Sequence, residues 1–191
     1  MKTIYKIART ELQTLFYSPI AWLILVIFTF QASMAFTNGL AGNVRSQELG
    51  YGLYNVTMGV FAGWRGMFIA MQQYLYLYIP LLTMGLMSRE FSSGSIKLLY
   101  SSPITSTQIV LGKYLSMMLY NLVLMCILAV YLVFAAITIK SADVPLILSG
   151  MLGLYLLVCA YAAIGLFMSS ITSYQVVAAM GTLAVLAVLN F

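Results

Sequence analysis

Few side chains in this sequence could carry out acid–base, nucleophilic or metal chemistry. It has no histidine, nine Lys or Arg and four Asp or Glu. Without histidine, a Ser–His hydrolase, an HExxH zinc protease and a His-ligated haem are excluded. No carboxylate lies in the middle of a long apolar run, which argues against an aspartyl intramembrane protease and a carboxylate proton relay. The chain is therefore not expected to be an enzyme, and no metal site or cofactor is predicted.

The sequence also lacks a phosphate-binding loop for ATP. Its only Gly-Lys pair, Gly112-Lys113, is followed by Tyr114 instead of Ser or Thr, and the upstream glycine of G-x-x-x-x-G-K-[ST] is missing. The two cysteines, Cys126 and Cys159, lie inside apolar runs, where structural thiols are expected. The chain is therefore not expected to be an ATPase itself.

The polar residues gather instead in one compact stretch, residues 88–114, which reads SREFSSGSIKLLYSSPITSTQIVLGKY. It holds Arg89, Glu90, Lys97 and Lys113 between two long apolar runs. In a chain this apolar, a compact polar segment is the part of the protein that a water-soluble partner can contact. The stretch is interpreted as a docking element, with no active site of its own.

The composition places this hinge in a membrane protein. Hydrophobic residues make up 63% of the chain and charged residues 7%, against about 25% charged residues in a soluble domain. Uncharged runs of 18 or more residues indicate transmembrane helices. The predicted fold class is all-α, a polytopic helical membrane protein. The basic residues are scattered at the ends of apolar runs, which predicts contact with lipid headgroups and no nucleic acid binding.

Residues 1–18 are predicted to form an amphipathic helix that lies in the membrane interface. Lys2, Lys6 and Arg9 fall on one face at helical spacing, and apolar residues fill the opposite face. Residues 19–191 then form the transmembrane domain.

Five spans are predicted in that domain, at about 19–38, 66–88, 114–139, 145–168 and 176–191. The last two are separated because 48 uncharged residues follow position 143. As one helix they would extend about 72 Å, more than twice the hydrocarbon thickness of about 30 Å. The fold of the stretch 38–65 is left open. Because the chain stops within the fifth span with no basic or aromatic anchor, it is expected to be truncated at its C-terminus.

The distribution of Lys and Arg predicts the orientation. The N-terminal helix and the hinge carry six of them, and the opposite side carries three, Arg45, Arg65 and Lys140. Because the more basic side faces the cytoplasm, the N-terminus and the hinge are expected inside and the stretch 38–65 outside.

The hinge itself contains two helix-start signals. Ser93 is predicted to cap a short helix that begins near Gly94 and ends at Pro103. Residues 105–108, Thr-Ser-Thr-Gln, match a capping box and predict a helix leading into the third span. The short helix would lie across the cytoplasmic face and convert movement of a docked partner into tilting of the second and third spans. A merely solvated loop is the alternative.

Polar and aromatic side chains inside the spans are candidates for lining a transport pathway. Packing between helices, with hydrogen bonds across them, is the alternative explanation. The candidates are Gln31, Gln72, Gln73, Tyr74 and Tyr78.

The hinge residues resemble a known family. Glu90, Gly94-Ser95, Leu98-Leu99, Pro103-Ile104 and Leu111-Gly112-Lys113 are similar to the hinge of type-2 ATP-binding-cassette (ABC) exporter permeases. Within that family the chain is most similar to the amino-terminal region of the gliding-motility-associated permease subunit, over essentially all of its length.

This resemblance implies that residues 94–100 form a coupling helix seated in a groove of a separate nucleotide-binding subunit, which binds the ATP. Family permeases have six spans and work as dimers, so the partners implied are that ATPase, a second permease as homodimer or heterodimer, and membrane lipids. The chain departs from the pattern by ending in the fifth span. The resemblance assigns these residues to coupling: Arg89, Glu90, Gly94, Ser95, Ile96, Lys97, Leu98, Tyr100 and Pro103.

The leading hypothesis is therefore a permease subunit of an ABC exporter in a bacterial inner membrane, with a link to gliding motility. The alternative is a non-transporting membrane anchor or assembly factor for a surface-motility or secretion complex. An ion channel or secondary transporter is disfavoured, because no mid-span charge and no paired broken helices mark an ion site.

Overall fold

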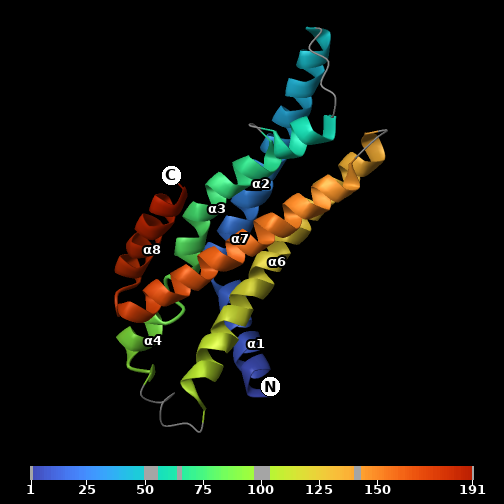
Figure 1. The fold of residues 1–191 in the computed structure, drawn as a ribbon. Helices are drawn as coiled ribbons and strands as arrows, with labels where there is room; N and C mark the ends of the chain where they lie inside the picture. Colours follow the sequence, from blue (N-terminus) through green and yellow to red (C-terminus); the bar gives the residue numbers. More distant parts are fainter. Residues whose placement is uncertain (1, 50–55, 64–65, 97–103, 140–142, 191) are drawn as a thin grey trace. The chain divides into compact units, whose positions relative to one another are not determined.

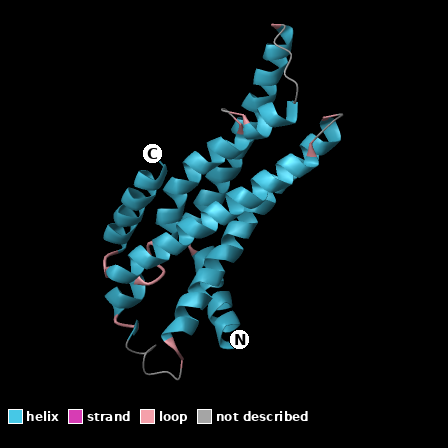
Figure 2. Ribbon diagram, in the orientation of Figure 1, coloured by secondary structure: helices cyan, strands magenta, loops and turns pink. Residues whose placement is uncertain are grey.

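A computed structural model describes residues 2–49, 56–63, 66–96, 104–139 and 143–190. Every regular element in these ranges is a helix (Figures 1 and 2), which confirms the predicted all-α class. The elements are α1 (Lys2–Tyr17), α2 (Pro19–Glu48), the π-helical turn η1 (Met58–Ala62), α3 (Met67–Thr83), α4 (Ser88–Ser93), α6 (Ser106–Thr138), α7 (Val144–Ile171) and α8 (Gln175–Asn190).

Three helices are long and apolar enough to cross a membrane. They cover Pro19–Ser46, Ser106–Thr138 and Val144–Ile171, each with a strongly apolar 18-residue window. The apolar helices α3, with 17 residues, and α8, with 16, are shorter. Three such helices make the chain a multi-pass membrane protein.

Helix α2 extends further than the predicted first span. It begins at Pro19, as predicted, but continues to Glu48 instead of ending near 38. Its 30 residues make it about 45 Å long at 1.5 Å per residue, which exceeds the hydrocarbon thickness. Residues 39–48 are less apolar than the run before them, but lower hydropathy alone does not end a helix, and no proline interrupts them. The helix therefore continues for about ten residues past the predicted end of the first span.

The second span also differs from its prediction. Helix α3 ends at Thr83 instead of near 88, and a turn over 84–87 leads into the separate short helix α4. Pro80 lies within the last turn of α3, and the Thr83 hydroxyl donates a hydrogen bond to the Ile79 carbonyl at 2.8 Å. The chain therefore leaves the span and reorients before it reaches the hinge residues.

The helix starts and breaks predicted further along the chain are confirmed. Thr105 and Gln108 form the reciprocal capping box, because each backbone N–H donates to the other's side-chain oxygen at 3.4 Å. Helix α6 begins directly after it, at Ser106. The break predicted at residues 169–175 lies at 172–174, between α7 and α8.

The chain divides into two compact units. Unit 1 comprises residues 1–24, 76–121 and 157–191, and its largely apolar core also contains hydrogen-bonded polar side chains. The fully buried Tyr120 donates its hydroxyl to the Ala21 carbonyl at 2.8 Å and packs its ring 5.7 Å from that of Phe16. Gly112 lets α6 approach α1 closely, since a Cβ there would lie 2.7 Å from the Ile7 side chain.

Gly165 is a second point of close approach in unit 1. A Cβ at this position would overlap the hydroxyl of Thr83 and lie 2.7 Å from its Cβ. Overpacking of this kind costs about 1–3 kcal/mol. We therefore expect Gly165→Ala to lower the midpoint of thermal unfolding in detergent. Gly153→Ala in the same helix is the control, because a Cβ there meets nothing within 4 Å. Equal midpoints for the two variants would contradict the close packing of α7 on α3.

Unit 2 comprises residues 25–75 and 122–156. Aromatic rings form its core: Phe36 lies 6.0 Å from Phe61 and 5.6 Å from Tyr131, measured between ring centroids. The Tyr131 hydroxyl also lies within hydrogen-bonding distance of the Ser33 hydroxyl, at 2.6 Å. These contacts join α2 to η1 and to the second half of α6.

Candidate functional site

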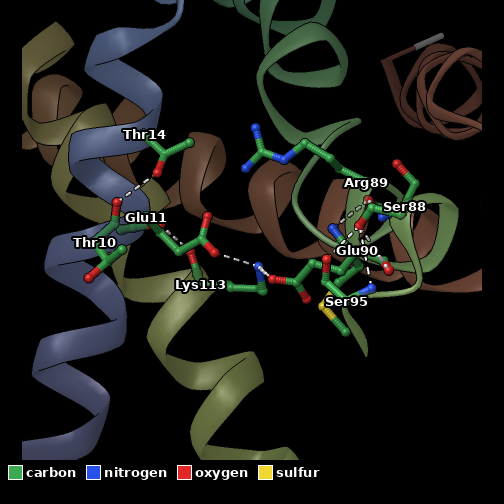
Figure 3. Close-up of polar contacts among 12 residues, drawn as sticks. Thr10, Glu11, Thr14, Ser88, Arg89, Glu90, Ser95 and Lys113 are labelled. Atoms are coloured by element: carbon green, nitrogen blue, oxygen red, sulfur yellow. Dashed lines mark hydrogen bonds and ion pairs between the residues drawn. The ribbon is translucent and has the colours of Figure 1, made fainter. Parts of the chain in front are cut away.

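The centre of unit 1 holds a cluster of three charged side chains, which we call the charged triad: Glu11, Glu90 and Lys113. The Lys113 ammonium lies 2.6 Å from Glu11 Oε1 and 2.7 Å from Glu90 Oε1 (Figure 3). The lysine side chain is 1% exposed, and the two carboxylates are 14% and 16% exposed. One cation therefore holds together α1, the start of the hinge in α4, and α6.

The burial of the triad determines what it can do. A lysine removed from water is tolerated when it is paired and hydrogen-bonded, and removing one partner leaves an uncompensated charge. Here two carboxylates share one ammonium, and Glu90 Oε2 is buried without a hydrogen-bond partner among the described residues. Such a group is suited to fixing the relative positions of three helices and is not arranged for catalysis.

Helix α4 is positioned by a side chain from another helix. Ser169 of α7 accepts hydrogen bonds from the backbone N–H groups of Met87, at 3.0 Å, and Ser88, at 3.1 Å. Its own hydroxyl donates to the Met84 carbonyl at 3.0 Å. The first N–H groups of a helix lack partners within the helix, and the side chain of Met87, at the N-cap position of α4, does not bind them. The Ser169 hydroxyl of α7 caps the helix instead.

Gly94 ends α4 and corrects one prediction. Its φ of +71° is left-handed, and its N–H donates to the Phe91 carbonyl at 3.3 Å. Gly94 is therefore the C-terminal cap of α4. The short helix predicted to begin near Gly94 has its first helical residue at Ile96, because a right-handed helix requires negative φ. Ser93, predicted as an N-cap, is the last residue of α4, and its hydroxyl accepts a hydrogen bond from the Ser95 N–H at 3.4 Å.

The other predicted coupling residues divide into two groups. Arg89 is exposed and Ile96 is buried, with 9% exposure. The rest of the predicted coupling helix lies outside the described residues, including Lys97, Leu98, Tyr100 and Pro103.

A small cavity of about 110 Å³ lies next to the triad. Glu11, Arg89 and Gln175 contribute its charged and amide groups, and most of the other lining residues are apolar, four leucines among them. The Arg89 side chain extends from α4 (Figure 3) and forms no ion pair with the described residues. Among the residues that the structure describes, the hinge therefore presents the Arg89 guanidinium without an ion pair beside the buried triad.

The amphipathic character predicted for residues 1–18 is seen in α1. Lys6 and Arg9 are exposed, whereas Ala8 is 1% exposed and Ile7 faces Gly112. Lys2 belongs to α1 as well, but its side chain lies outside the described set.

The five predicted pathway residues differ in their surroundings. Gln31 and Gln72 are half-buried and Tyr78 is buried, and each makes a polar or ring interaction. Gln73 and Tyr74 are exposed. Of the five, Gln73 is found among the described lining residues of a cavity of about 960 Å³ in unit 2.

Two residues of the site, Glu11 and Ser169, were missed by the sequence analysis. Glu11 lies four residues after Ile7, on the side of α1 that is otherwise apolar. A carboxylate on the apolar face of an amphipathic helix is a signal of a buried partner, and it could have identified the residue. Ser169 carries no comparable signal, because serine is common where helices end.

Comparison with known proteins identifies the family. The family model described as "ABC-2 family transporter protein" matches residues 5–191. No curated protein and no solved structure matched the chain. Membrane components of this family have no catalytic activity themselves and generally pair with nucleotide-binding subunits. With its apolar helices, its buried charged triad and a match over nearly its whole length, the chain belongs to the ABC-2 transporter family, as a membrane permease component.

Proposed function

We propose that this permease exports its substrate across a bacterial inner membrane, driven by ATP hydrolysis in a separate nucleotide-binding subunit that docks on residues 88–113. The N-terminus and this segment face the cytoplasm, as the excess of Lys and Arg on that side predicts. The permease works as a dimer with a second permease chain. Its association with gliding motility is supported by the resemblance of the hinge sequence alone.

The observation that carries this proposal is the charged triad. Lys113 binds a carboxylate on α1 and another on α4 at 2.6 and 2.7 Å, so a displacement of the hinge is transmitted to α6 and α1 together. Since α6 is one of the long apolar helices, a force on α4 acts on a spanning helix without an intervening flexible linker. A mere anchor has no need for this connection.

The second support is the rigid turn before the hinge. Ser169 holds the backbone of Met87 and Ser88, and α4 follows immediately. The start of the docking segment is thus tied to α7 as well as to the triad. Arg89 extends from this fixed helix with a free guanidinium, which suits contact with an acidic surface on the ATPase.

The direct test is co-purification from native membranes in mild detergent, followed by mass spectrometry and an ATPase assay. A stoichiometric ATPase bearing a phosphate-binding loop supports the exporter. Its absence would overturn the proposal in favour of a non-transporting anchor or assembly factor for a surface-motility or secretion complex.

Gly94 gives a sharper test of coupling. Gly94→Pro forces φ to about −65° where the chain requires +71°, so it should misdirect the segment that follows α4. We expect loss of transport-coupled ATPase activity, by at least tenfold, while the complex still co-purifies. Gly94→Ala should show a smaller loss, because a left-handed residue with a Cβ costs about 1–2 kcal/mol.

Gly85→Ala is the matched control for Gly94→Ala. Both positions have open space for a Cβ, but only Gly94 has a positive φ. Gly85→Ala should therefore keep full activity. Loss of assembly in parallel with activity in the Gly94 variants would point to anchoring and against force transmission.

A further inference from the structure

Unit 2 contains a half-open cavity of about 960 Å³. Its walls come from the C-terminal part of α2, from η1 and from the first turns of α3. The polar groups that line it are Asn38, Asn43, Arg45, Ser46 and Gln73. The chain is 63% hydrophobic, but the cavity lies beyond the apolar part of α2. Its lining is therefore polar.

Glycines form much of the remaining wall and bring backbone to the surface of the cavity. Gly39 and Gly42 of α2, Gly59 of η1 and Gly63 directly after η1 all line it. A Cβ on Gly39 would lie 3.2 Å from the Val60 carbonyl oxygen, so α2 and η1 are packed as closely as their backbones allow. A wall without side chains lets a ligand approach the backbone directly.

Asn43 lies deepest in this wall. It is 6% exposed, and its side-chain amide donates to the Gly39 carbonyl at 2.8 Å. Its Oδ1 has no hydrogen-bond partner among the described residues and would lie 2.5 Å from a Cβ on Gly59. A buried amide oxygen without a partner is uncommon in a native protein, and here it belongs to a residue that lines the cavity. Because an amide oxygen accepts hydrogen bonds, it suits a hydroxyl or amide donor of the ligand and not the anionic group itself.

The charges around the cavity have one sign. Arg45 is exposed and forms no ion pair with the described residues, and no carboxylate is among the described lining residues. Glu48 lies on the same helix but does not line the cavity.

We propose that this cavity binds the anionic group of a polar ligand, a phosphate or a carboxylate, with Arg45 as the counter-charge. Guanidinium groups bind both anions through two parallel hydrogen bonds, and the exposed Gln73 amide provides further donors. The Ser46 hydroxyl already donates to the Gly42 carbonyl at 2.9 Å. That the bound ligand is the exported substrate rests on the function proposed above. The anion preference of the cavity does not depend on it.

Charge-selective labelling of a cysteine in the cavity tests this preference. Ser46→Cys is introduced into the full-length chain with Cys126 and Cys159 replaced by alanine, and the protein is placed in phosphatidylcholine nanodiscs. The rates of modification by an anionic and a cationic methanethiosulfonate reagent are then compared. Met58→Cys is the control, because this residue is exposed on η1 but does not line the cavity.

The anionic reagent should react preferentially at Ser46→Cys and not at Met58→Cys. Adding Arg45→Gln should lower the anionic-to-cationic rate ratio by about tenfold, as expected for a unit charge some 6 Å away in water. A ratio that does not change with Arg45→Gln overturns the proposal. The labelling needs no ATPase, so its outcome is independent of the co-purification experiment. Failure of the anion site and failure of the proposed function can therefore be distinguished.

Two further arms distinguish the sources of the anion. Protection of Ser46→Cys by phosphatidylglycerol in the nanodisc, lost with Arg45→Gln, identifies a lipid headgroup. Protection by soluble glycerol 3-phosphate, lost in the same way, identifies a water-borne ligand. If neither probe slows the labelling of Ser46→Cys, the cavity does not bind phosphate anions and the proposal is wrong for that group.

Discussion

Replacing Lys113 by methionine is expected to lower the free energy of unfolding by about 3–5 kcal/mol, the range found when one member of a buried ion pair is removed. Methionine keeps the length of the side chain but leaves Glu11 and Glu90 without a cation. Both carboxylates are more than four-fifths buried, so neither can regain full hydration. The expected readout is a large fall in the thermal midpoint of the detergent-solubilised chain and loss of coupled ATPase activity.

The neutral triple variant Glu11→Gln, Glu90→Gln, Lys113→Met separates charge from packing. It removes all three charges of the triad and should recover most of the lost stability, because no unpaired charge is buried. If the triad transmits force, this variant should remain inactive despite its recovered stability. Lys6→Met is the surface control, since Lys6 is exposed on α1. A Lys113→Met chain as stable as the unmodified protein would contradict the buried triad.

Replacing Ser169 by alanine should lower stability by about 2–4 kcal/mol. The change removes the acceptor for two backbone N–H groups, those of Met87 and Ser88, and both residues are buried. Each buried donor left without a partner costs about 1–3 kcal/mol. Because the same hydroxyl fixes the turn that leads into α4, coupled ATPase activity should fall even at temperatures where the chain remains folded.

Ser170→Ala is the matched control for this variant. Ser170 is the next residue of α7, but it is exposed and its hydroxyl donates only to the Phe167 carbonyl of its own helix. Alanine there should leave both the thermal midpoint and the activity unchanged. Equal effects at Ser169 and Ser170 would show that the cap from α7 does not position α4.

The triad and the Ser169 cap act on the same short helix from two directions. Glu90 ties α4 to α6 and α1 through Lys113, and Ser169 ties its first turn to α7. The Gly94 cap then turns the chain out of this fixed helix through a left-handed residue. The hinge therefore begins at a helix that is held in place by its neighbours. A segment attached in this way can move the spanning helices, whereas a loosely attached segment would bend.

The sequence by itself determined the class of the protein and most of its helices. The amphipathic helix α1, the start of α2 at Pro19, the capping box before α6 and the break between α7 and α8 were all predicted. These features depend on local patterns, namely hydropathy over 18 residues, proline, and side chains that bond their own backbone within three positions. The match to the ABC-2 transporter family follows from the same linear sequence.

Only the tertiary structure decided which polar groups meet. Glu11 and Lys113 are separated by 102 positions, and Ser169 lies more than 80 positions from the turn that it caps. Predicting such pairs requires knowing how the helices pack, because an ammonium, a carboxylate and a hydroxyl accept many partners. The hinge sequence predicted that Glu90 matters to coupling, but not that its carboxylate points inward to Lys113. Local spacing determines where a helix begins, whereas the desolvation of a buried charge is decided by every helix that surrounds it.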